Sequence, residues 1–165
     1  MAAYYKDVTN RAIAELQGPL DAAAHFRGSK SEKEKQDAMD KLVEAYNGIV
    51  SPLRGLGFNF GIGRSYSEGA ANHGTSYALD LVPPSRSLND AYSLAEAAAN
   101  LEVCEQVWIE ASDDSGNFHV HVKYDTSGKN SSPDLKTIMS RDGSSVQDGL
   151  VHSQEKVEGA VANVY

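Results

Sequence analysis

The sequence predicts an α+β domain in which a small antiparallel sheet is flanked by helices. Three observations support this class. Residues 1–50 space their apolar side chains as helices do, residues 51–127 become rich in glycine and alternate polar with apolar positions, and residues 128–165 are polar with weak periodicity. With 165 residues the chain has the usual size of one domain. We therefore predict an N-terminal helical segment, a core and a C-terminal arm with these bounds.

Two helices are predicted within residues 1–50. In the second helix the helical spacing is clear, and its apolar members are Met39, Leu42, Val43, Tyr46 and Ile49. Residues 76–82 (SYALDLV) predict a strand, and residues 88–102 predict a third helix. Residues 107–111 and 118–124 predict a β-hairpin, because the SDDSGN stretch between them is rich in turn-forming residues.

The composition excludes several classes of function. The formal charge of −8 disfavours binding to nucleic acid or to anionic membranes, which requires a basic surface. No apolar run approaches the ~20 residues that span a bilayer, and the N-terminus has no signal-peptide pattern, so we expect a protein made in the cytoplasm without membrane insertion. Cys104 is the only cysteine and is expected to be a small buried residue, so any metal must be held by histidine and carboxylate.

The clearest functional motif is the H-x-H pair His119 and His121 on the second predicted hairpin strand. Because side chains alternate along a strand, these two histidines and Lys123 project one way, while Val120 and Val122 project the other. The apolar set faces the core, so we expect both imidazoles on the open face. Such a pair can direct two ring nitrogens at one metal ion.

A second motif, HGTSYALD, places His73 seven residues before Asp80. The predicted strand carries the carboxylate, with the histidine just before that strand. Neutral imidazole and carboxylate are ligands that suit Zn²⁺, and three protein ligands leave the fourth position free for water. That open position is typical of a catalytic zinc site.

Together these motifs resemble the zinc peptidase superfamily of D-Ala-D-Ala carboxypeptidases, murein endopeptidases, phage L-Ala-D-Glu endolysins and hedgehog domains. The family pattern is roughly S-x-H-x-x-G-x-A-x-D followed later by H-x-H. Residues 57–124 carry the likeness through ANHGTSYALDL and HVH. The resemblance implies that His73, Asp80 and His121 bind zinc and that His119 stabilises the tetrahedral intermediate.

The resemblance also implies a substrate-binding role for Arg64, in GIGRSYS, through its planar fork of donors. The sequence departs from the family pattern where Ala71 replaces a serine and Ser76 replaces a glycine. It also lacks the acid that usually precedes H-x-H and acts as general base. Two substitutes are available. Asp114 lies at the turn, and Glu110 reaches the site if paired hairpin residues sum to 229 or 231, but not to 230.

The function that this resemblance implies is zinc-dependent cleavage of peptidoglycan stem peptides by a phage-encoded protein, either released at lysis or carried in the virion. The alternative is a structural protein of a phage tail or baseplate that keeps the peptidase fold with a degenerate or inactive metal site. The N-terminal helices and the C-terminal arm would then contact sister subunits or other virion proteins. We expect the polar arm to dock on this domain, on a sister subunit or in a larger assembly.

Overall fold

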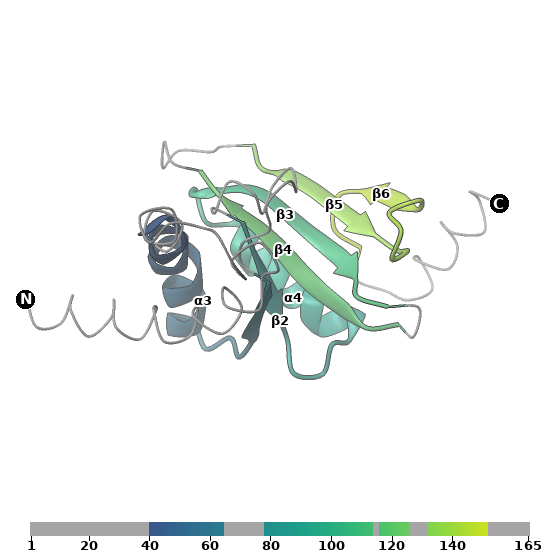
Figure 1. Ribbon diagram of the computed structural model, residues 1–165, viewed down its shortest axis with the longest axis horizontal. Helices are drawn as coiled ribbons and strands as arrows, with labels where there is room; N and C mark the ends of the chain where they lie inside the picture. The colour runs from purple at the N-terminus through teal and green to yellow at the C-terminus, as the bar shows by residue number, and fades with distance from the viewer. Residues whose placement is uncertain (1–39, 65–77, 114–115, 126–131, 152–165) are drawn as a thin grey trace, which may run out of the picture.

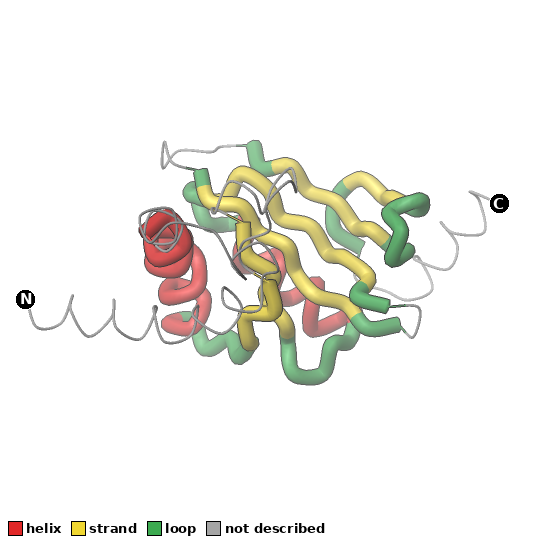
Figure 2. The backbone as a smooth tube through the Cα atoms, viewed as in Figure 1, coloured by secondary structure: helices red, strands yellow, loops and turns green. Residues whose placement is uncertain are grey.

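The computed structural model describes residues 40–64, 78–113, 116–125 and 132–151. Six strands form one mixed sheet in the order β1-β2-β4-β3-β5-β6, and Figure 2 shows them as a continuous layer. Their bounds are β1 Gly61–Arg64, β2 Ala78–Val82, β3 Cys104–Ala111, β4 Phe118–Tyr124, β5 Asp134–Ile138 and β6 Val146–Asp148. The α+β class and the hairpin of β3 and β4 are confirmed.

The sheet departs from the predicted antiparallel arrangement at one place. β5 follows β4 in the chain but pairs with the far side of β3, and it runs parallel to that strand. The other neighbouring pairs are antiparallel. The strands β5 and β6 come from the polar stretch after residue 128, so its described part docks on the sheet of its own domain.

The second predicted helix is helical throughout its described part. Residues 40–45 are α-helical and continue through a π-helical turn, η2 (Tyr46–Val50), into α3 (Ser51–Gly55). The wider π turn directly precedes Pro52, which has no N–H to donate and whose ring crowds the preceding turn. This helical stretch lies at the left in Figure 1 and contributes its apolar side chains to the core.

The helix α4 (Leu88–Ala99) crosses behind the sheet in Figure 1. Ser87 caps its N-terminus, since the Ser87 hydroxyl accepts a hydrogen bond of 3.1 Å from the Asp90 N–H. The helix ends three residues before the predicted end at 102, where residues 100–103 form turns that lead into β3. None of the helices in the described ranges is long and apolar enough to cross a membrane.

The two faces of the sheet differ completely. One face packs on the helices and is apolar, and its buried residues include Leu79, Leu81, Val107, Ile109, Phe118, Val120 and Val122. This confirms the direction predicted for Val120 and Val122. The other face carries acids, histidines and Trp108. The helical side therefore supplies the core, and the polar side is the place to look for chemistry.

Candidate metal centre

Three neighbouring strands bring a cluster of metal-ligating side chains to the polar face of the sheet. Asp80 on β2 pairs with His121 on β4, and Glu110 on β3 pairs with His119 on β4. Residues paired across neighbouring strands share a face, so all four side chains project to the same side. The ligand atoms of Asp80, Glu110 and His119 lie within 4.8 Å of one another and form a possible metal site.

His119 directs one ring nitrogen at both acids. Its Nε2 lies 3.6 Å from Asp80 Oδ2 and 3.5 Å from Glu110 Oε1. Its Nδ1 forms a hydrogen bond of 2.7 Å with the hydroxyl of Ser112. The partner on Nδ1 orients the ring, which leaves Nε2 facing the carboxylates.

His121 repeats this arrangement with the opposite ring nitrogen. Its Nδ1 lies 3.3 Å from Asp80 Oδ1 and 3.6 Å from Glu110 Oε1, and its Nε2 lies 3.0 Å from Gln106 Oε1. The ring stacks on Trp108 with a centroid separation of 4.8 Å and an interplanar angle of 24°. His121 is only 2% exposed. The expectation that both imidazoles lie on an open face is therefore wrong for His121, because Trp108 stacks against it.

Trp108 is held in this position from the neighbouring strand. Its Nε1 donates a hydrogen bond of 3.2 Å to Asp134 Oδ2 of β5, and Lys136 Nζ lies 5.0 Å from the centre of its ring. The side chain is half-buried. Trp108 is thus packed on the polar face as a wall of the cluster, and it takes no part in the apolar core.

The separations between the imidazole nitrogens and the carboxylate oxygens allow these atoms to share a metal ion. Charge-assisted N–H···O bonds are usually ~2.7–2.9 Å long, whereas the four imidazole–carboxylate separations here are 3.3–3.6 Å. Two ligands of a tetrahedral zinc ion, each ~2.0–2.1 Å from the metal, are ~3.3–3.4 Å apart. Nitrogen and carboxylate oxygen also suit zinc chemically. The residues present therefore fit a zinc ion.

The structure brings together most of the predicted site residues that it describes. Asp80, His119 and His121 converge, and the hairpin register between Gln106 and Ala111 sums to 229, which turns Glu110 toward the site. Arg64 lies on β1, the strand next to β2, and its backbone pairs in register with that of Asp80. The predicted ligand His73 and the predicted substitute base Asp114 lie outside the described residues.

Two residues of the cluster went unpredicted, namely Gln106 and Ser112. Gln106 shares the parity of Trp108 and Glu110 along β3, and Ser112, which directly follows this strand, contacts His119. The signal was available: a histidine that binds metal usually forms a hydrogen bond through its other ring nitrogen, so the polar residues of that face were candidates.

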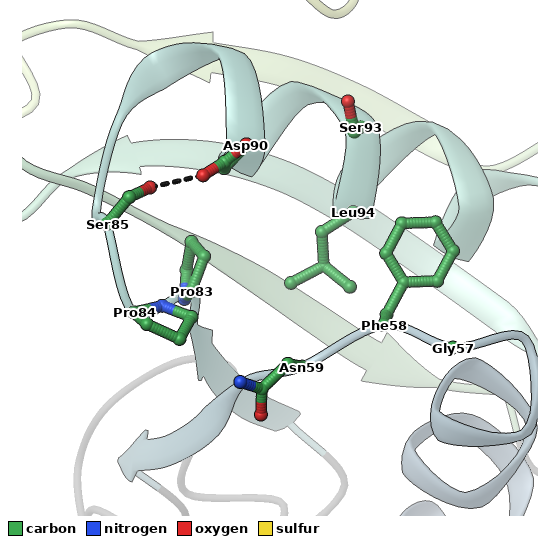
Figure 3. Close-up of a pocket in the computed structure, with 9 residues that line it drawn as sticks. All are labelled: Gly57, Phe58, Asn59, Pro83, Pro84, Ser85, Asp90, Ser93 and Leu94. Carbon is green, nitrogen blue, oxygen red and sulfur yellow. Dashed lines mark hydrogen bonds between the residues drawn. The ribbon is translucent and has the colours of Figure 1, made fainter.

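A separate pocket of about 360 Å³ lies between α4 and the segments that flank β1 and β2. Figure 3 shows its apolar walls, Phe58, Leu94, Pro83 and Pro84, with the Ser85 hydroxyl donating to the Asp90 carboxylate at the rim. The pocket contains no member of the metal-ligating cluster. Within the described residues, the metal-ligating cluster therefore lies on the sheet face, apart from this pocket.

Comparison of the chain with protein-family models, with curated proteins and with solved structures gives no match. Any function proposed for this protein therefore has to be argued from its own sequence and from the site geometry described above.

Proposed function

We propose that this protein is a zinc-dependent peptidase that cleaves peptidoglycan stem peptides, encoded by a phage and acting at lysis or from the virion. One observation carries the proposal: two imidazoles, each hydrogen-bonded through one ring nitrogen, face the same two carboxylates through the other. The substrate class comes from the resemblance of residues 57–124 to cell-wall peptidases.

In this proposal Asp80 and His121 hold the zinc, and His73 completes the ligand set as the resemblance implies. A bound zinc ion supplies Lewis acidity for the scissile carbonyl and for the attacking water. His121 Nδ1 lies 3.3 Å from Asp80 Oδ1 and 3.6 Å from Glu110 Oε1, so a zinc ion held by Asp80 and His121 would have the Glu110 carboxylate nearby, outside its ligand set. That division leaves Glu110 free for proton transfer.

Glu110 is the general base of this mechanism. Its side chain is 26% exposed, which keeps it accessible to water and substrate, and Oε1 lies beside both imidazoles. It accepts the proton of the attacking water and passes it to the leaving amine. Glu110 thus supplies, from the neighbouring strand, the acid that is absent before H-x-H.

His119 and Arg64 complete the residues of the reaction. His119 is more exposed than His121, with 17% of its side chain accessible against 3%. It is therefore placed to donate a hydrogen bond to the developing oxyanion. Arg64, in register with Asp80, binds a carboxylate or carbonyl of the substrate peptide.

The test is to purify the protein with zinc, measure its metal content, and follow cleavage of peptidoglycan and of a defined stem peptide. We expect bound zinc, turnover that chelation removes and zinc restores, and loss of both metal and turnover in His121→Ala. Circular dichroism of that variant establishes that it is folded. Bound zinc without turnover on either substrate would favour the tail or baseplate structural protein, and the absence of bound metal would contradict both the zinc site and the peptidase.

A further inference from the structure

The strand β3 contains an irregularity next to the candidate metal centre. Cys104 pairs with Tyr124, whereas Gln106 pairs with Lys123, so the register shifts by one residue between Cys104 and Gln106. Two residues apart on a regular strand, these side chains would share a face. Instead Cys104 is fully buried in the apolar core and Gln106 lies on the polar face beside His121. The β-bulge redirects Gln106 into the site.

The contact that results determines which nitrogen of His121 carries the proton. The amide oxygen of Gln106 can only accept a hydrogen bond, and it lies 3.0 Å from Nε2. With the amide oriented in this way, an Nε2–H donates to Gln106, and the lone pair of the neutral ring is then on Nδ1. That nitrogen is the one that faces Asp80 and Glu110.

The corresponding contact of His119 has no such directing effect. Its partner is the hydroxyl of Ser112, which can donate or accept, so either tautomer of His119 can form that hydrogen bond. The ring of His121 is in addition held by stacking on Trp108, which fixes its plane. His121 is thus constrained in both ring orientation and proton position.

We infer that Gln106 is a positioning residue that holds His121 in the Nε2–H tautomer and so directs its Nδ1 lone pair at a metal ion. This inference rests on the proposed function for the identity of the ion. It assigns the β-bulge of β3 a role in building the site. It also adds to the site a residue that lies outside the H-x-H motif.

Two substitutions separate the acceptor from the volume of the side chain. Gln106→Leu removes the acceptor, and Gln106→Glu retains an acceptor at nearly the same position. We expect Gln106→Leu to weaken zinc and Co²⁺ binding by roughly 10-fold to 100-fold, as loss of such hydrogen-bond partners typically does. Gln106→Glu should keep the binding within a few-fold of the wild type, because it retains the acceptor. Gln147→Leu, the same change on the edge strand β6, is the matched control and should leave binding unchanged.

A metal-free measurement distinguishes this inference from the proposed function. The ¹⁵N shifts of the His121 ring at about pH 8 report which nitrogen carries the proton. We expect Nε2–H in the wild type and in Gln106→Glu, and a shift toward a mixture of tautomers in Gln106→Leu. An unchanged tautomer in Gln106→Leu would overturn the inference even if zinc binds. The expected tautomers in a protein that binds no zinc would support the role of Gln106 and contradict the zinc peptidase.

Discussion

Ile109 and Glu110 are neighbours on β3, yet they serve opposite faces of the sheet. Ile109 is fully buried among apolar side chains, whereas Glu110 is half-buried between two imidazoles. Because side chains alternate along a strand, one set of β3 residues builds the core and the intervening set builds the polar cluster. The polar face places the carboxylates of Asp80 and Glu110 within 4.8 Å of each other, and their repulsion lowers the free energy of unfolding. Burial of the apolar face offsets this loss of stability. We therefore expect stability and chemistry to respond separately to substitutions on the two faces.

The largest expected effect is on the polar face. Glu110→Gln preserves the shape of the side chain but removes its basicity. If Glu110 is the general base, turnover of a stem peptide should fall by ~10²-fold to 10⁴-fold. Zinc affinity should stay within a few-fold of the wild type, because Asp80 and His121 remain. Steady-state kinetics and competition with a metal chelator measure the two quantities.

Glu105→Gln is the matched control for this substitution. Glu105 lies on the same strand but is exposed, and it forms an ion pair of 3.7 Å with Lys123. We expect little change in turnover, because Glu105 is exposed and is not a member of the metal-ligating cluster. Loss of zinc in Glu110→Gln would contradict the role of Glu110 as base. It would place Glu110 among the ligands, together with Asp80 and His119.

The next effect is on the apolar face. Ile109→Ala deletes buried methylene and methyl groups from the apolar core and should lower the free energy of unfolding by ~2–5 kcal/mol. Urea unfolding measures this loss. The thiol of Cys104 provides a second readout, because burial raises its pKa to about 12 and keeps it protonated and shielded. Labelling of Cys104 should become faster in Ile109→Ala as the unfolded population increases.

The comparison of the faces predicts that folded Ile109→Ala binds zinc as the wild type does. A loss of zinc affinity under conditions where the variant is folded would show that the two faces are coupled through β3. In that case packing against α4 would set the position of Glu110, and the core would be part of the site's geometry.

The alternation FHVHVKY was enough to predict which side chains enter the core and which reach the site. The register of the hairpin stayed open among paired residue numbers that sum to 229, 230 or 231, and the structure adopts 229 between Gln106 and Ala111. Alternation disfavours 230, because that sum would place Val107 and Ile109 on the face of the two histidines. It cannot choose between 229 and 231, which the geometry of the turn selects. The burial of His121 was also beyond prediction, since it depends on Trp108, and on β5 holding that ring in place.

The polar C-terminal stretch shows a second limit of sequence reasoning. The strands β5 and β6 contain few apolar residues, so no periodic pattern predicted them. Their stability comes from the pairing of β5 with β3 and of β6 with β5. The Thr137 hydroxyl adds two hydrogen bonds of 2.9 Å, one donated to Gly149 O and one accepted from Val151 N. Backbone pairing of this kind does not depend on hydrophobic side chains. The parallel addition of β5 was therefore invisible in the sequence.

The smallest effect is expected in the loop between β5 and β6, which belongs to neither face. Hydrogen bonds from the side chain and backbone of Ser144, and then from Ser140, lower the pKa of Asp142 to about 2. An unfolded aspartate titrates near ~3.9, so the folded state favours the ionised form. This contribution to stability is present above about pH 4 and is lost as the pH falls toward about 2.

Asp142→Asn should therefore lower the urea midpoint slightly near neutral pH, and the difference from the wild type should diminish between about pH 4 and about pH 2. An NMR titration of the Asp142 carboxyl carbon measures its pKa directly. Zinc affinity and turnover should not change, because β3 separates β5 and β6, which the loop connects, from the strands β2 and β4 that carry Asp80, His119 and His121. A midpoint difference that persists unchanged down to about pH 2 would mean that the Asp142 charge contributes nothing, and that the substitution acts only through the turn's conformation.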